Sequence, residues 1–430
     1  MPSIAFKMTA TALVAGMLAL TMAPAGSAET STPQDTARFL AGLPPAPDSP
    51  LAALTKSRSW EEHARAFNSI FDQEDKATLS KVRAFSEAHL TDKHDTVLYM
   101  FSGPDFLYAT SFFPHASTYV MAGLEPVGNV PQLTSLPRGS VDETLRSLEI
   151  SLRSILNLSF FITRDMKSRL SSGQVYGTLP ILYVFLARTG KTIHDVSFVA
   201  LDKDGNFLTP DDPAAKGADK RSARSAPERT AKGVKIVLSD GDGPLQTLYY
   251  FSTNIADDGV SSSGLLPFCA KLGVADSLFK SASYLMHREG FNKIRNFILN
   301  HSATILQDDS GIPLAFFEPA KWRLQPFGRY LGPLAMFRGA NQPKLAELFR
   351  SKADPLDFGI GYKWRKNESN LLLAQRTGPL APDGTLIPAL TTSEDALATA
   401  KLRQEEHVVV NHEPPPSIWY SFWPRPTPPK

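Results

Sequence analysis

TVLYMFSGPDFLYATSFFPHASTYVMAGLEPVG, residues 96–128, is the stretch of sequence that decides the fold. Its runs 96–101 and 118–124 are rich in residues that favour strands. Between them, a turn at 102–105 leads into a short aromatic segment, 106–113, that is predicted as a helix. A strand, a turn, a helix and a second strand in this order indicate a protein that combines helices with a sheet.

Apolar patterns on both sides of this stretch extend the prediction. Residues 60–90 show helical spacing and are expected to form two helices with a break near Asp72-Gln73. Residues 140–170 are predicted as a helix, and a shorter one is expected between Thr178 and Gly190. The remaining predictions are a strand at 194–201, a hairpin of 234–239 with 245–252, helices at 277–287, 291–306 and 342–352, and short strands near 314–318, 322–327 and 358–364. The expected fold class is α+β, or α/β with few parallel crossovers, with a mixed sheet packed by several helices.

Proline and charge divide the chain into six segments. We expect a signal peptide at 1–28, a Pro-rich tether at 29–59, an N-terminal α/β part at 60–208, a disordered linker at 209–232, a C-terminal α/β part at 233–409 and a Pro-rich tail at 410–430. The two α/β parts are expected to share one body.

The first residues have the organisation of a secretory signal peptide. Lys7 precedes an apolar run from Met8 to Met22, and small residues offer cleavage after Ala25 or Ala28. The run is shorter than the roughly 20 apolar residues of a membrane-spanning helix. We therefore expect a soluble mature protein in the bacterial periplasm or outside the cell, without a membrane-spanning segment.

The composition argues against some classes of binding partner. The net charge of +2 and the absence of a basic stripe interleaved with aromatic residues argue against a nucleic-acid partner. The single cysteine, Cys269, lies in an apolar phrase and is expected to be a buried, inert thiol. No cofactor motif is recognisable, so the cofactor stays unknown and the expected partner is an unidentified envelope ligand or protein.

Three stretches combine polar residues with turn residues. In the first, Ser102, Gly103 and Asp105 follow a predicted strand, where α/β folds place ligands. A helix cap at Ser102 and Asp105 explains the same residues without a ligand. His115 is a further ligand-binding candidate, and Glu125 is a candidate general base.

The second stretch is KSASYLMH, residues 280–287. On a helix, Lys280, Ser283 and His287 would share one face. Ser283 is therefore the candidate nucleophile and His287 its assistant. The alternative is a serine that only allows close helix packing.

The third stretch, QDDSGIP, pairs two carboxylates after a helix. Asp308 and Asp309 are candidate ligands of a hard cation, Asp309 is also a candidate catalytic base, and Gln307 is a candidate ligand-binding residue. A helix stop at Gly311 is the alternative.

The phrases FSGPDFLYATSFFP, YVMAGLEPVG, FKSASYLMH and ILQDDSGIP resemble a family of uncharacterised exported bacterial proteins. The resemblance spans about Trp60 to Arg376. It implies a bacterial envelope setting and supplies no activity, cofactor or catalytic residue.

Two functions follow as hypotheses. The first is a protein that binds an envelope ligand or partner at a concave site near Asp105, Glu125 and the Asp308-Asp309 pair. Its apolar lining is expected to come from the aromatic residues Phe112, Phe113, Tyr119, Tyr284, Trp322 and Tyr330. The second is a carboxylate-based hydrolase, with or without a divalent metal, in which Asp309 or Glu125 is the base. The hydrolase hypothesis requires the carboxylates and His287 to meet at one site.

Overall fold

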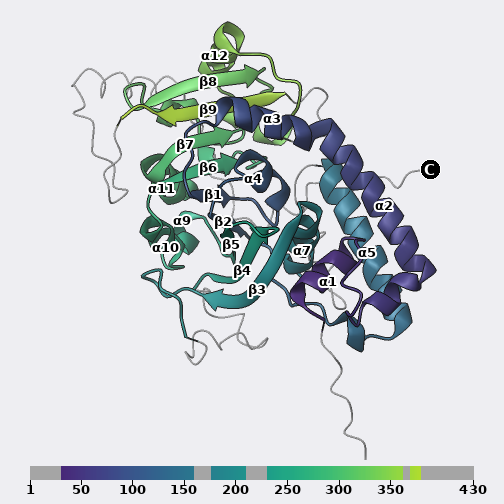
Figure 1. The fold of residues 1–430 in the computed structure, drawn as a ribbon. Coiled ribbons are helices and arrows are strands. Elements are labelled where there is room, and N and C mark those ends of the chain that lie inside the picture. Colours follow the sequence, from purple (N-terminus) through teal and green to yellow (C-terminus); the bar gives the residue numbers. More distant parts are fainter. Residues whose placement is uncertain (1–30, 159–175, 210–229, 362–368, 379–430) are drawn as a thin grey trace, which may run out of the picture.

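The computed structural model describes residues 31–158, 176–209, 230–361 and 369–378, which Figure 1 draws as a coloured ribbon. The predicted signal peptide, the Pro-rich tail and nearly all of the predicted linker lie outside these residues. No helix in the described ranges is long and apolar enough to cross a membrane.

A nine-stranded mixed sheet forms the centre of the described chain. Its strands, in sheet order, are β3 (Lys191–Ala200), β4 (Lys232–Asp240), β5 (Leu245–Ser252), β2 (Thr118–Gly123), β1 (Thr96–Met100), β6 (Ala275–Phe279), β7 (Ser302–Gln307), β9 (Asn370–Arg376) and β8 (Trp322–Gly328). The strands from β5 to β7 are parallel, and antiparallel pairs extend the sheet on both sides. The α+β prediction is confirmed, and strands from 60–208 and 233–409 pair within this one sheet.

Helices cover both faces of the sheet (Figure 1). They are α1 (Pro33–Leu40), α2 (Arg58–Glu74), α3 (Ser80–His89), α4 (Phe106–Phe112), α5 (Arg138–Leu158), α7 (Leu179–Arg188), α9 (Asp257–Val260), α10 (Leu265–Lys271), α11 (Asn292–His301) and α12 (Pro343–Lys352). Successive residues of β1 alternate between two cores, because strand side chains point to opposite faces. Val97 and Tyr99 pack in the core that contains α4 and α7, whereas Leu98 and Met100 pack in the core that contains α10 and α11.

The connections of the central strands create a switch point in the sheet. The crossover from β1 to β2 passes through α4 on one face, and the crossover from β6 to β7 passes through α11 on the other. Because β1 and β6 are neighbours, the chain leaves these two strands toward opposite faces. In open α/β sheets, ligands bind beyond the carboxyl ends of the strands at such a point.

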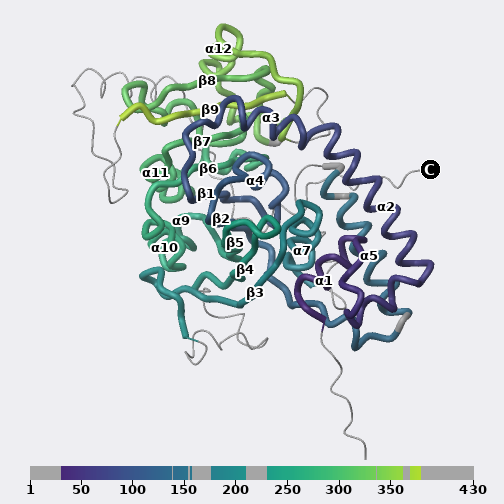
Figure 2. Tube along the Cα trace, viewed as in Figure 1, coloured from purple at the N-terminus to yellow at the C-terminus, as the bar shows by residue number. Residues whose placement is uncertain are grey.

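Upstream of the sheet, the prediction of an extended tether is wrong. The predicted tether contains α1, which Thr32 caps by accepting a hydrogen bond from the Asp35 backbone amide. Figure 2 shows this helix beside α7 and β3, and its Phe39 and Leu40 are fully buried, so apolar packing outweighs the Pro-rich composition. The two helices predicted in residues 60–90 are α2 and α3, and their junction is a π-helical turn, Asp75–Leu79, just beyond the predicted break near Asp72-Gln73.

Downstream, predicted helices give way to strands. Residues 277–287 contain the end of β6 and an irregular turn, and α11 ends at His301, where β7 begins. Both strands are short and buried, and pairing with their neighbours overrides the local helical pattern. The predicted strand near 314–318 is a 3₁₀ turn, Leu314–Phe316, and the described part of 358–364 is irregular.

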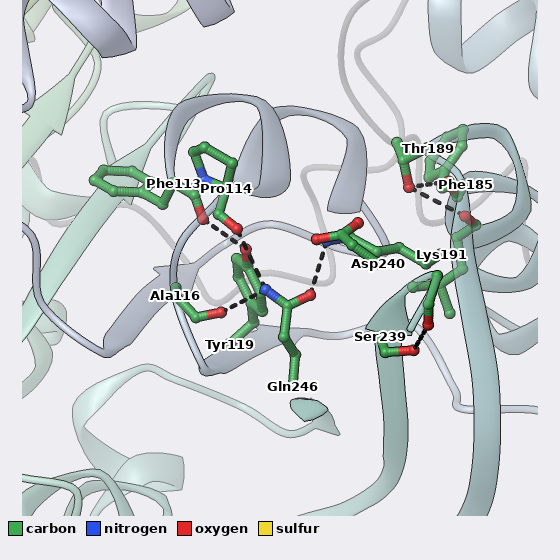
Figure 3. Close-up of polar contacts among 12 residues, drawn as sticks. Phe113, Pro114, Ala116, Tyr119, Phe185, Thr189, Lys191, Ser239, Asp240 and Gln246 are labelled. Carbon is green, nitrogen blue, oxygen red and sulfur yellow. Dashed lines mark hydrogen bonds and ion pairs between the residues drawn. The ribbon is translucent and has the colours of Figure 1, made fainter. Parts of the chain in front are cut away.

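A polar network fixes the antiparallel side of the sheet (Figure 3). The buried ammonium of Lys191 lies 2.7 Å from Asp240 Oδ2 and 2.7 Å from Gln246 Oε1. The amide of Gln246 donates in turn to the Ala116 carbonyl at 2.8 Å, in the loop that leads into β2. The network therefore ties β3, β4 and β5 to the amino end of β2.

Candidate functional site

The turn after β1, residues 101–105, carries the first predicted stretch. Ser102 continues the sheet by donating its backbone amide to Ala122, and its hydroxyl donates to the Gly103 carbonyl at 2.8 Å. Asp105 occupies the N-cap position of α4, but its side chain caps no backbone amide. The helix-cap explanation is therefore wrong for this carboxylate.

Asp105 instead forms a buried ion pair across the switch point. Its Oδ2 lies 2.9 Å from Lys280 Nζ and accepts a hydrogen bond from the Tyr99 hydroxyl at 2.9 Å. The Lys280 ammonium also lies over the ring of Tyr108, 4.3 Å from its centroid. Burial and the nearby Asp105 carboxylate raise the pKa of Tyr99, which keeps this hydroxyl a donor.

The turn after β6, residues 280–284, is strained. Ser281, Ser283 and Tyr284 have φ between 53° and 55°, and Phe101 at the end of β1 has φ 62°. These are the only non-glycine residues with positive φ in the described chain. Strained backbone conformations of this kind are concentrated at functional sites. Positive φ values are incompatible with a right-handed helix, so the predicted helix is wrong and Lys280, Ser283 and His287 do not share a helix face.

The turn after β7 holds the two predicted cation ligands, but they face different partners. Asp308 accepts hydrogen bonds from the backbone amides of Ser281 and Ser310, each at 2.9 Å, whereas Asp309 Oδ1 accepts from the Tyr284 hydroxyl at 3.2 Å. No group of three or more His, Cys, Asp or Glu side chains that could hold a metal ion exists within the described residues. The geometry therefore gives the metal prediction no support.

Burial raises the pKa of Asp308, while hydrogen bonds from Ser310 and Ser281 act in the opposite direction. The Asp308 side chain therefore owes its position to fixed donors from two turns. Asp309 is anchored separately, because its backbone amide donates to the side-chain oxygen of Asn370 at 2.8 Å. Asn370 begins β9, so a third element supports the β7 turn.

Gln307 serves this turn rather than a ligand. Its amide nitrogen donates to the Ile312 carbonyl and its oxygen accepts from the Ile312 backbone amide, both at 2.8 Å. Both ends of the side chain are thus occupied by its own loop, and the ligand-binding prediction for Gln307 is not supported. Gly311 allows this closure, since a Cβ there would lie 2.4 Å from Gln307 Oε1.

Glu125 follows β2 and lies beside the β1 turn. Its backbone carbonyl accepts from the Tyr250 hydroxyl at 2.9 Å, and its Oε2 lies 3.4 Å from the same hydroxyl. A Cβ on Gly123 would lie 2.4 Å from Glu125 Oε2 and 3.2 Å from the Gly103 Cα. The glycine therefore leaves the space in which the carboxylate approaches the β1 turn.

His287 lies in a 3₁₀ turn, Leu285–His287, behind the strained β6 turn. Its ring packs edge-on against Tyr284, with 5.3 Å between centroids, and its buried Nε2 has no hydrogen-bond partner among the described residues. Burial and the charge of Arg295 lower the pKa of His287 to about 3, although the Gly311 backbone opposes the shift. The imidazole is therefore neutral at physiological pH.

His115 lies at the opposite edge of the sheet. It is exposed and precedes β2, next to residues whose carbonyls accept from Gln246. It cannot join residues at the carboxyl ends of the strands, so its predicted place in the site is wrong. The predicted aromatic lining is also divided: Phe112, Phe113 and Tyr119 belong to one core and Trp322 to the other.

Contacts thus link the turns after three neighbouring strands, β1, β6 and β7, into one cluster, and Glu125 follows β2, the next strand in the sheet. We call it the switch-point cluster, and its members are Asp105, Glu125, Lys280, Ser283, Tyr284, His287, Asp308 and Asp309. Lys280 is predicted only as a neighbour of Ser283 on a helix face, and Tyr284 only as part of an aromatic lining, because the sequence pattern there indicates a helix. The sequence signal for the end of β6 is the short apolar run that ends at Phe279, just before the polar residues of the turn. No protein-family model, curated protein or solved structure matches this chain.

Proposed function

We propose that this protein binds a small polar ligand at the switch-point cluster. The observation that supports the proposal is the buried Asp105–Lys280 ion pair, which joins the β1 and β6 turns where the crossovers diverge. Burying charges costs stability unless the geometry is good, and hydrophobic residues often serve as well or better. A concentration of buried charges, hydroxyls and strained backbone at a switch point is typical of a binding site.

Ser283 and His287 give the cluster its most accessible members. Both are half-buried, whereas Asp105, Glu125, Lys280, Asp308 and Asp309 are buried. A ligand that approaches the β6 turn would thus meet Ser283 first, with the fixed charges of the cluster behind it. Preorganised polar groups of this kind orient a ligand and give specificity.

A thermal-shift screen of the purified protein tests the proposal. The screen covers cell-wall fragments, sugars, nucleotides and metal ions, and a ligand present at 100 times its Kd should stabilise the fold by about 2.7 kcal/mol. The near-isosteric variant Glu125→Gln and the variant Ser283→Ala should lose most of that shift. His115→Gln, at the opposite sheet edge, is the matched control and should keep it. Equal shifts in all three variants would place the ligand elsewhere.

We also propose export to the bacterial envelope, as the leader in residues 1–28 and the family resemblance suggest. Expression of the full chain in a bacterial host, followed by cell fractionation and N-terminal sequencing, tests this proposal. Cleavage after Ala25 or Ala28 is expected in the exported fraction. A full-length protein confined to the cytoplasm would contradict it.

A carboxylate-based hydrolase is the second candidate. Asp105, Glu125, His287 and Asp308 follow strands that end at the same edge of the sheet, whereas that function requires them to meet at one site. A histidine with a pKa of about 3 is a poor general base at neutral pH, and Asp105 is engaged by Lys280, so binding is the better-supported function. Turnover of chromogenic esters or glycosides that Glu125→Gln abolishes would favour the hydrolase.

A further inference from the structure

The imidazole of His287 places a polar atom inside the switch-point cluster. His287 Nε2 is buried, and no described residue donates a hydrogen bond to it or accepts one from it. An unsatisfied buried polar atom costs stability, and in native proteins such atoms are rare. We therefore expect this nitrogen to form a hydrogen bond with a group outside the described residues.

The protonation state of His287 defines that partner. A neutral imidazole has one nitrogen that carries a proton and one that is a bare acceptor. A hydrogen bond to the Gly311 backbone raises the pKa of His287. This bond favours a proton on the ring nitrogen that makes it. The remaining nitrogen then accepts, so the partner must be a hydrogen-bond donor.

The charges around the His287 ring limit the charge that the donor can carry. Arg295 is close enough to lower the pKa of His287, which disfavours a second positive charge beside the ring. The buried carboxylates of Asp308 and Asp309 in the neighbouring turn disfavour an anion. A neutral group that donates a proton, such as an alcohol hydroxyl, meets both conditions.

The other groups of the cluster can form hydrogen bonds with several hydroxyls of one ligand. Tyr284 presents a phenol that already bonds to Asp309 Oδ1, and the ring of Phe337 lies 5.4 Å from the Tyr284 ring. Ser283 adds a half-buried hydroxyl in the same turn. Hydroxyls, carboxylates and aromatic rings together match the donor, acceptor and apolar surfaces of a polyol.

We infer that the ligand of the switch-point cluster is a neutral, polyhydroxylated molecule of the sugar class, and that one of its hydroxyls donates to His287 Nε2. This inference rests on the proposed binding function. His287 is in this view a specificity-determining residue, because a ligand without the hydroxyl would leave its nitrogen unpaired.

The test measures binding of chosen probes by calorimetry. Glucose and N-acetylglucosamine represent neutral sugars, glucosamine a cation and glucose 6-phosphate an anion. The neutral probes should bind the wild-type protein. His287→Gln keeps an amide group near the position of Nε2 and should retain part of the affinity, whereas His287→Asn should lose at least about tenfold. His301→Asn, at the amino end of β7, is the matched control and should bind as the wild type does.

A second readout follows the nitrogen itself. In protein with ¹⁵N-labelled histidine, the Nε2 resonance of His287 should move when a neutral sugar is added and stay still when glucose 6-phosphate is added. Equal sugar affinity in His287→Asn, preferential binding of the phosphate, or a Nε2 resonance that no probe moves because an ordered water satisfies it would overturn the inference.

The two proposals fail in different ways. If a non-sugar ligand from the thermal-shift screen stabilises the protein and Glu125→Gln removes that effect, the binding function stands and the sugar class falls. If Glu125→Gln and Ser283→Ala leave the effect of every stabilising ligand unchanged, the binding function at this cluster falls as well.

Discussion

Lys280 Nζ lies 2.9 Å from Asp105 Oδ2, and both side chains are almost completely buried. The contact joins the turn that ends β1 to the turn that ends β6, two strands whose onward connections lie on opposite faces of the sheet. The ion pair therefore connects the two strands at the switch point of the sheet.

Removing one partner of this pair should be costly. Lys280→Met leaves the Asp105 carboxylate buried without its cation, and such a loss typically costs about 3–5 kcal/mol. The double variant Asp105→Asn with Lys280→Met removes both charges and keeps an acceptor for Tyr99, so it should recover a large part of this loss. Urea unfolding of the two single variants and the double variant measures the coupling; additive effects would show that the two charges do not interact.

Gly123 is predicted to tolerate no side chain. A Cβ there would meet Glu125 Oε2 at 2.4 Å, the Tyr250 hydroxyl at 3.0 Å and the Gly103 Cα at 3.2 Å. Gly123→Ala should therefore lower the free energy of unfolding by about 1–3 kcal/mol and weaken ligand binding at the cluster.

Gly139→Ala in α5 is the control for this prediction, since its Cβ would meet nothing within 4 Å. Gly139 lies in the first turn of α5, where the advantage of Ala over Gly is at most the roughly 0.5–1 kcal/mol of a helix interior, so this variant should be neutral or slightly stabilising. Thermal unfolding compares the two variants. A Gly123→Ala protein as stable as Gly139→Ala would contradict the close approach of Glu125.

The sequence predicts those elements whose local pattern agrees with their surroundings. The strands at 96–101 and 118–124 and the hairpin around Asp240 are bounded by strong turn residues, and the structure has them all. The positions of Asp105 and Glu125 at strand ends follow directly, because parallel neighbours end at the same sheet edge.

The remainder depends on contacts that local patterns do not contain. β6 and β7 are each only five or six residues long, so their apolar runs fit a helix or a strand equally well until they pair with each other. The ion pair of Lys280 with Asp105 spans 175 positions of sequence, as 280 − 105 shows, and no spacing rule reaches that far. The error about Ser283 follows from the helix prediction rather than from the choice of polar residues.

Lys191 should be important for the antiparallel side of the sheet. It is buried, and Lys191→Met leaves Gln246 Oε1 without this donor, which costs about 1–3 kcal/mol, whereas the exposed Asp240 returns to water. Lys203→Met removes an exposed pair with Asp204 and should change stability by less than about 1 kcal/mol. Chemical denaturation separates the two variants, and equal stabilities would show that the Lys191 network contributes nothing.

Stability should also depend on pH through His94 and Asp276. His94 Nδ1 lies 3.0 Å from Oδ1 of Asp276, which is buried in β6, and this hydrogen bond raises the pKa of His94 against the effect of burial. A folded-state pKa above the unfolded value of about 6.5 means that the folded protein binds the proton more tightly. The stabilisation is therefore complete below about pH 6.5 and is lost as the pH rises through the folded-state pKa.

Burial also raises the pKa of Asp276, so its titration acts in the same direction at more acidic pH. The free energy of unfolding should accordingly fall as the pH rises from about 6.5 through the folded-state pKa of His94, with a slope of at most about 1.4 kcal/mol per pH unit for this single proton. In His94→Gln this slope should flatten, whereas the exposed control His115→Gln should keep it. Urea unfolding at a series of pH values provides the measurement, and a slope that His94→Gln leaves unchanged would assign the dependence to another group.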